Sequence, residues 1–364
     1  MTVDLYIGLM SGTSLDGVDA VLVDFAGKLP QVVSSAYRPF DAALRAELLA
    51  LNSPGYDEIA RAAAAGNELS QAYAAAVEAV LRDAGVTADS VRAVGCHGQT
   101  VRHRPERGYT TQIGNPALLA ERSGIRVVTD FRSRDIAAGG QGAPLAPAFH
   151  AELFLDRDEN RAILNLGGIA NLTRLARDGS VAGFDCGPGN CLMDLWCALH
   201  THVPFDLAGD WAAGGRIIPA LLARMQQEPY FALLPPKSTG RDLFNEAWLR
   251  ALLGPHDDPR DVQATLLELT AQGIAGAIDR HLPLTRRVIA CGGGTRNAAL
   301  MARLQELLHP AVLEPSDRHG IDSQLVEAVA FAWLARQALQ GIPGNLPSVT
   351  GARGRRVLGA VYPP

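Results

Sequence analysis

The chain has 364 residues, of which 48% are hydrophobic and 20% are charged, and its formal net charge is −5. That length favours two domains, and that hydrophobic content is enough to bury a sizeable core. The slightly negative charge gives no electrostatic reason to expect nucleic acid or an anionic membrane surface as a partner.

Cysteine usage and the first residues indicate a reducing compartment. The five cysteines form no C-x-x-C pair and no zinc spacing, so we expect them to be reduced and buried. No basic stretch opens the sequence as in a signal peptide, and no apolar run is long enough to cross a bilayer. We therefore expect a soluble, cytoplasmic protein without a membrane partner.

Residues 5–23 predict a strand, a turn rich in Gly, Ser and Thr, and a second strand that pairs back on the first. Glycines in such a turn let backbone N–H groups point inward at phosphate oxygens, and Asp16 and Asp19 could hold Mg2+, usually through water. An ordinary hairpin with a polar loop explains the same residues. The turn is not a P-loop, because no G-x-x-x-x-G-K-[ST] occurs and a strand follows.

A strand is predicted from Val91 to Cys96, after an Ala-rich helix from Asp57 to about Asp83 that ends at Gly85. His97 follows this strand. A side chain at that position either faces the ligand crevice of an α/β sheet or has a purely structural role in packing. Farther along, Asn115 is the predicted N-cap of a short helix ending at Gly124, with Pro116 in its first turn, and this needs no ligand.

Arg132 follows a strand predicted at residues 127–130 and precedes the glycine-dense residues 139–144. Two arginines, Arg132 and Arg134, beside such a turn suit an anionic ligand such as a carboxylate, and a solvated surface loop is the alternative. In the later loop at residues 235–241, Lys237 and Arg241 could likewise contact phosphate, or they could simply face solvent.

A second strand–turn–strand pattern occurs at residues 162–175, with Gly167-Gly168 in the turn. It suggests duplicated α/β lobes that face each other, although chance can repeat a hairpin pattern. A strand at residues 181–184 then ends at Asp185, before a sharp turn. We expect its carboxylate to project into the crevice as a proton acceptor, and a turn-forming aspartate is the alternative.

A third glycine turn, Gly292-Gly293-Gly294, lies between a predicted strand and a helix that Asn297 opens. This junction permits close approach of a flat or anionic ligand. Asp261 is the predicted N-cap of the amphipathic helix before it, and Ser323 that of the last long helix. Glu327 lies in the first turn of that last helix, where the helix dipole alone explains it.

The three glycine turns match the two phosphate loops and the adenosine loop of the actin, sugar-kinase and Hsp70 type of ATPase. Within that group the chain resembles the anhydro-N-acetylmuramic acid kinase family nearly end to end. Cys186 stands where threonine is also familiar. The matching segments are residues 8–19, 97–100, 112–116, 130–132, 139–145, 165–168, 184–190, 237–240, 291–294, 327 and 331–335.

The resemblance implies a two-lobed, actin-like (ribonuclease H-like) α/β fold with mixed sheets, flanking helices and a central cleft that closes on its ligands. It implies an N-terminal lobe of residues 1–132 plus about 343–364 and a C-terminal lobe of residues 133–342. The implied activity uses ATP, Mg2+ and water to open the ring of 1,6-anhydro-N-acetylmuramic acid and phosphorylate O6, in peptidoglycan recycling.

The resemblance also implies the role of each site residue. Asp185 would be the general base acting on water, Arg132 would pair with the lactyl carboxylate, and Glu327 would contact the sugar. His97, Gln99 and Asn115 would line the pocket, and Asp16 or Asp19 would hold Mg2+. The implied nucleotide and phosphate contacts are Gly12, Thr13, Ser14, Leu15, Asp16, Gly17, Val18, Asp19, Gly167, Gly168, Gly292, Gly293 and Gly294.

Two other functions remain open from the sequence. One is an ordinary sugar hydroxyl kinase of the same architecture, in which Asp185 deprotonates a hydroxyl. The other is a nucleotide-gated binding or chaperone ATPase, which the lack of a recognisable peptide-binding domain disfavours. The last helix is also a possible homodimer face.

Overall fold

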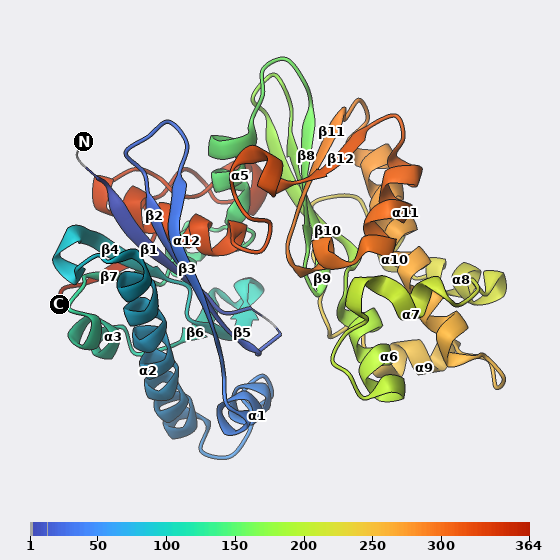
Figure 1. The fold of residues 1–364 in the computed structure, drawn as a ribbon, viewed down its shortest axis with the longest axis horizontal. Coiled ribbons are helices and arrows are strands. Elements are labelled where there is room, and N and C mark those ends of the chain that lie inside the picture. The colour runs from blue at the N-terminus through green and yellow to red at the C-terminus, as the bar shows by residue number, and fades with distance from the viewer. Residues whose placement is uncertain (1–2, 13) are drawn as a thin grey trace. The chain divides into compact units, whose positions relative to one another are not determined.

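The computed structural model describes residues 3–12 and 14–364, which form two compact units (Figure 1). Unit 1 comprises Met1–Phe149 and Leu325–Pro364, and unit 2 comprises His150–Gln324, so unit 2 is inserted into unit 1. Relative to the lobes implied by the sequence, residues 133–149 and 325–342 lie in unit 1. The second segment does so because α12 (Val326–Gln340) packs on β1 (Leu5–Met10) and β4 (Val91–Cys96).

Unit 1 is built on a six-stranded sheet in the order β13-β7-β4-β1-β2-β3. Its first three strands are antiparallel, β4 and β7 then run parallel to β1, and β13 closes the edge antiparallel to β7. A separate pair, β5 and β6, forms a small antiparallel hairpin. The remaining strands are β2 (Gly17–Asp24), β3 (Gln31–Pro39), β5 (Gln99–Arg104), β6 (Tyr109–Ile113), β7 (Val127–Thr129) and β13 (Ala360–Tyr362).

Helices cover both faces of this sheet, as the alternation along its strands requires. Ile7 belongs to the core cluster beneath α2, whereas Gly8 and Gly95 face α12. A Cβ at Gly8 would collide with the backbone of Ala328, and one at Gly95 with that of Phe331, so both glycines permit the close approach of α12. The other helices are α1 (Ala42–Ala50), α2 (Glu58–Ala84), α3 (Pro116–Ser123), α4 (Ser133–Ala137), α5 (Ala146–Phe154), which continues into unit 2, and α13 (Pro347–Thr350).

Unit 2 repeats the same sheet topology in the order β10-β9-β8-β11-β12. Three antiparallel strands are again followed by two that run parallel to the first of them, as in a ribonuclease H-like fold. The repeat confirms the predicted duplication and the two-lobed α/β fold with mixed sheets. The strands are β8 (Arg161–Leu166), β9 (Ile169–Leu175), β10 (Val181–Pro188), β11 (Arg287–Cys291) and β12 (Val312–Pro315).

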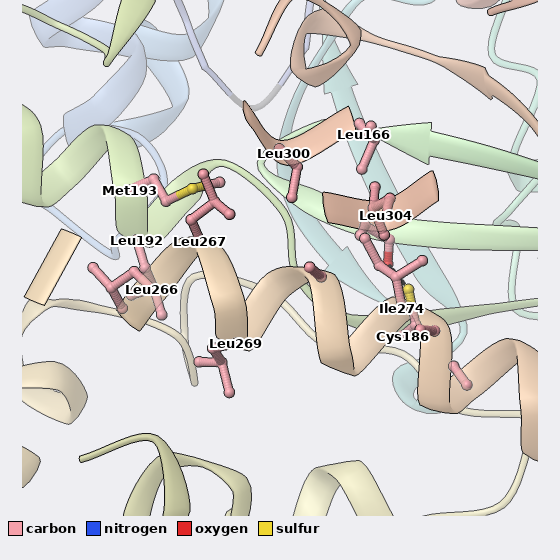
Figure 2. Packing of buried hydrophobic residues seen from close by; sticks show 14 of the residues in the cluster. Leu166, Cys186, Leu192, Met193, Leu266, Leu267, Leu269, Ile274, Leu300 and Leu304 are labelled. Atoms are coloured by element: carbon pink, nitrogen blue, oxygen red, sulfur yellow. Dashed lines mark hydrogen bonds between the residues drawn. The ribbon is translucent and has the colours of Figure 1, made fainter. Parts of the chain in front are cut away.

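The core of unit 2 lies around α10 (Pro259–His281), which packs against β10 and four neighbouring helices. Figure 2 shows Leu266, Leu267, Leu269 and Ile274 of this helix among buried residues of other elements. Cys186, on β10, belongs to this core. The other helices of unit 2 are α6 (Cys191–Thr201), α7 (Asp210–Ala213), α8 (Pro219–Gln226), α9 (Glu246–Leu252) and α11 (Ala298–Leu308). The 3-10 turns at 207–209, 229–232, 293–296 and 316–319 lie in unit 2, and those at 88–90 and 105–107 lie in unit 1.

Two N-cap predictions are wrong. Asp258 rather than Asp261 caps α10, because its side chain accepts from the N–H groups of Arg260 and Asp261. The N-cap position of α12 is Leu325, not Ser323. Residues 328–335 of α12 are all buried within unit 1, and the possible homodimer face on this helix stays a prediction.

Other predictions concern the thiols and the membrane. All five cysteines are free and buried, as predicted. Over residues 3–12 and 14–364, no helix combines the length and apolarity that a membrane span needs.

Candidate active site

His97 continues the chain beyond β4 and is held at the end of the sheet of unit 1. Its backbone N–H donates to the Leu9 carbonyl, and its Nδ1 bonds the Ser11 carbonyl at 3.2 Å. The ring lies 4.8 Å from that of Phe331. Burial and the nearby guanidinium of Arg132 lower the pKa of His97 to about 3. A neutral imidazole with Nδ1–H donating to Ser11 therefore presents Nε2 as an acceptor.

Arg132 is fixed at two of its nitrogens. Nη2 donates to Nε2 of His97 and Nη1 donates to the Gly142 carbonyl, both at 2.9 Å. Burial lowers the pKa of Arg132 to about 10, an effect that Glu327 opposes. Nε is enclosed and has no hydrogen-bond partner among the described residues. A guanidinium held in place, with N–H groups still to satisfy, suits a carboxylate ligand.

The remaining predicted sugar residues of unit 1 divide into two groups. Glu327 lies close enough to Arg132 to act on it electrostatically, and Gln99 donates from Nε2 to the Gly12 carbonyl at 3.2 Å, so both join the His97–Arg132 group. Asn115 instead caps α3: its Oδ1 accepts from Leu118 N–H and its Nδ2 donates to Asn67. This is the structural role that its sequence context predicts.

The first glycine turn joins β1 to β2 and lies next to this group. Ser11 is buried, donates to the Gly98 carbonyl at 3.2 Å and bonds the Tyr73 hydroxyl at 2.8 Å. Ser14 donates to Asp16 at 2.6 Å, with both side chains exposed, whereas Asp19 is half-buried on β2 opposite Met10. The predicted contact Thr13 lies outside the described residues. Leu15, Gly17 and Val18 are buried, so their side chains are not available to a ligand.

Asp185 lies within β10, not at the end of a strand as predicted, at the point where the pairing of β10 with β9 shifts register. Its Oδ2 accepts from the Ser238 hydroxyl at 2.8 Å and from the Thr239 N–H at 3.0 Å. Burial raises the pKa of Asp185, and these two hydrogen bonds oppose that rise. Both bonds end on Oδ2, so Oδ1 is the oxygen able to accept a proton.

The second and third glycine turns meet at the ends of β8 and β11. Asn190, after β10, donates from its backbone to the Gly167 carbonyl and from Nδ2 to that of Leu166. Asn165 keeps a buried Oδ1 with no partner among the described residues. A Cβ added at Gly167, Gly168 or Gly293 would meet its first neighbour only at 3.5 Å or more, so these turns leave room beside their backbones. Open glycine turns with an unsatisfied amide oxygen fit a nucleotide.

The carboxylates on the first turn are of the kind that Mg2+ prefers. No group of three or more His, Cys, Asp or Glu side chains is placed to hold a metal within residues 3–12 and 14–364. Mg2+ is commonly bound by one or two carboxylates together with water and substrate phosphates. Asp16 and Asp19 fit that mode rather than an all-protein cage.

Several groups around Asp185 were missed from the sequence. In loop 235–241, Lys237 and Arg241 are the predicted anion contacts, whereas the structure shows that Ser238 and Thr239 hold the acid. Lys237 instead donates to the Tyr230 carbonyl and lies 4.7 Å over its ring. The available signal was a Ser-Thr pair followed by glycine, which is typical of a loop that donates hydrogen bonds.

Asp194, on α6, is a second acid that sequence patterns did not reveal. Burial raises its pKa to about 7, Arg241 opposes the rise and Asp206 adds to it. Arg241 lies beside the second glycine turn, with Nη2 3.8 Å from the position of a Cβ on Gly168. A perturbed carboxyl and a cation next to a glycine turn make this side of unit 2 a candidate functional site.

The duplicated fold, the three glycine turns and the supported acid are features that a nucleotide-dependent kinase of the actin-like ATPase group requires. A sequence model described as anhydro-N-acetylmuramic acid kinase matches residues 4–364. A protein of that name from Variovorax paradoxus is 57% identical to this chain, over 100% of both chains. One from Bordetella parapertussis is 56% identical, over 99% of this chain and 96% of its own. One from Nitrosospira multiformis is 55% identical, over 98% of both. The chain belongs to the anhydro-N-acetylmuramic acid kinase family.

Proposed function

We propose that the protein phosphorylates 1,6-anhydro-N-acetylmuramic acid at O6 with ATP while water opens the anhydro ring, and that it does so in the cytoplasm during peptidoglycan recycling. Family membership supports the kinase activity and this substrate. The observation that carries the mechanism is Asp185, an acid held at Oδ2 by two donors with Oδ1 left to act as base.

The substrate explains why a base is needed. O6 is bonded to C1, so it carries no hydroxyl proton to remove. In the proposed step, a water oxygen bonds to C1 as the C1–O6 bond breaks, and O6 attacks the γ-phosphorus as the bond to the β-phosphate oxygen breaks. Asp185 takes a proton from the water, and the products are N-acetylmuramic acid 6-phosphate and ADP. General-base help of this kind contributes about 10²–10⁴-fold in rate.

The rest of the site is assigned to binding. Arg132 is proposed to pair with the lactyl carboxylate, with Glu327, His97 and Gln99 near the sugar. Residues 12–19, Gly167, Gly168 and residues 292–294 are proposed to contact ATP. Asp16 and Asp19 would hold Mg2+, which neutralises charge on a transferring phosphoryl group when bound. Asn115 is proposed only to shape the pocket wall through α3.

Water labelled with 18O tests the ring-opening step. We expect the label at C1 of the sugar phosphate, detected by mass spectrometry after a reaction in labelled water. Unlabelled product incubated in the same water corrects for exchange at the anomeric centre. Label at C1 no greater than this exchange would show that water does not attack C1, and would favour an ordinary hydroxyl kinase.

The pH dependence of kcat/KM tests Asp185 as the base. Because burial raises its pKa, the acid limb of the profile is expected above the range of an ordinary aspartate. Ser238→Ala removes a hydrogen bond that favours the ionised form, so the limb is expected to move to still higher pH. Ser238→Thr keeps the hydroxyl and is the matched control. A limb that stays in place in the alanine variant would argue against this assignment.

A further inference from the structure

We propose that Asp135, held by Thr350 and Asn345 of the C-terminal segment, is a positioning residue that fixes Arg132 and thereby sets selectivity for a sugar bearing a carboxylate. The inference rests on the proposed function, because it takes the lactyl carboxylate as the ligand of Arg132. It adds Asp135, Asn345 and Thr350, which are proposed to act on substrate binding only through Arg132.

Asp135 is an acid with no exposed surface, on α4. Its Oδ1 accepts from Asn345 Nδ2 at 2.6 Å and from the Thr350 hydroxyl at 2.8 Å. Its Oδ2 accepts from the Gly142 N–H at 2.8 Å. Burying an acid is costly unless its oxygens are hydrogen-bonded, so these three donors compensate a group that an apolar core would not contain.

Gly142 carries the effect of Asp135 to Arg132. Its N–H is held by Asp135, and its carbonyl accepts from Arg132 Nη1 at 2.9 Å. Its φ is +69°, and a Cβ there would meet the Ile136 side chain at 2.7 Å. Glycine adopts this conformation without strain, whereas a side chain would be both strained and crowded here. The two hydrogen bonds hold the peptide groups on either side, and the direction of the Gly142 carbonyl sets where the guanidinium lies.

The C-terminal segment holds the glycine-dense turn from both ends. The Gln141 N–H donates to the Thr350 carbonyl at 2.8 Å, and the Arg353 N–H donates to that of Ala138 at 2.9 Å. Asn345 is itself oriented by the Arg356 N–H, which donates to its Oδ1 at 2.6 Å. Hydrogen bonds thus lead from this segment through Asp135 and Gly142 to Nη1 of Arg132. The other fixed nitrogen of Arg132, Nη2, donates to His97.

The test compares two sugars, the anhydro sugar with its lactyl group and the same sugar with a hydroxyl in its place. Thr350→Val removes one donor to Asp135 at nearly constant shape, and Thr350→Ser keeps that donor. We expect the ratio of kcat/KM, lactyl-bearing sugar over hydroxyl sugar, to fall about three- to tenfold in the valine variant. A misplacement of about 1 Å can cost about 100-fold, and Asp135 keeps two of its three donors here, so the loss should be smaller. The serine variant should keep the wild-type ratio.

An equal loss on both sugars, or no loss, would show that the network is only structural and would overturn the inference. Gly142→Ala disturbs the same path next to Arg132 and replaces Thr350→Val if that variant does not fold. Arg132→Gln distinguishes the proposed carboxylate contact of Arg132 from the proposed positioning role of Asp135. If it leaves the ratio unchanged, the proposed carboxylate contact fails. If it lowers the ratio while Thr350→Val and Gly142→Ala do not, only the positioning role fails.

Discussion

Replacing Asp185 with asparagine is expected to lower kcat by about 10²–10⁴-fold while ATP still binds. Asparagine has nearly the shape of aspartate, and its amide oxygen can still accept from Ser238 and Thr239. It has no carboxylate to take a proton from water. Steady-state kinetics with the anhydro sugar gives the loss in kcat, and a calorimetric titration with ATP shows whether the nucleotide site is intact.

Asp279→Asn is the matched control, because Asp279 is an exposed residue near the end of α10 and lies outside the proposed site. It should turn over at the wild-type rate. An Asp185→Asn enzyme with near-normal turnover would mean that another group is the base, and Asp194, whose pKa burial raises to about 7, would be the next residue to replace.

Replacing Arg132 with glutamine is expected to lower kcat/KM for the lactyl-bearing sugar about 10- to 100-fold, the range for loss of a charge-assisted hydrogen bond. The loss should fall mainly on KM, since the carboxylate is distant in the substrate from the bonds that change. Arg132→Lys should recover little of it. A single ammonium cannot reproduce a planar guanidinium that bonds both His97 and Gly142.

Arg134→Gln is the control for this variant, because Arg134 is exposed two residues away, on the short helix α4 that Arg132 precedes. Its kinetics should match those of the wild type. If Arg132→Gln lowered kcat/KM equally for the sugar without a lactyl group, Arg132 would serve the architecture of unit 1 and not recognition of a carboxylate.

Local signals predicted much of the fold. Asn115, Pro116 and Gly124 mark the N-cap, the first turn and the C-cap of α3 as the structure has them, since capping depends on neighbouring residues alone. The two glycine hairpins were likewise predicted and proved to belong to sheets of the same topology. Glu327 and Arg132, placed in one site by resemblance, are near enough to interact.

Other features depend on contacts that are remote in sequence. Asp185 was expected at the end of a strand because glycines follow it, but pairing with β9 continues β10 to Pro188. The hydrogen bonds of Asp135 to Asn345 and Thr350 join positions more than 200 residues apart. No local sequence pattern predicts such a pairing, so the role of Asp135 could not be predicted from the sequence around Arg132.

The insertion of unit 2 into unit 1 has a consequence for how the protein is made. The strand β4 is complete at Cys96, yet α12, which covers Gly8 and Gly95, begins about 230 residues later at Val326. At ribosomal rates that interval lasts on the order of ten to fifty seconds. While unit 2 is being synthesised, the strands of unit 1 already made lack the helix that covers Gly8 and Gly95. An apolar face left uncovered for that time is prone to aggregation.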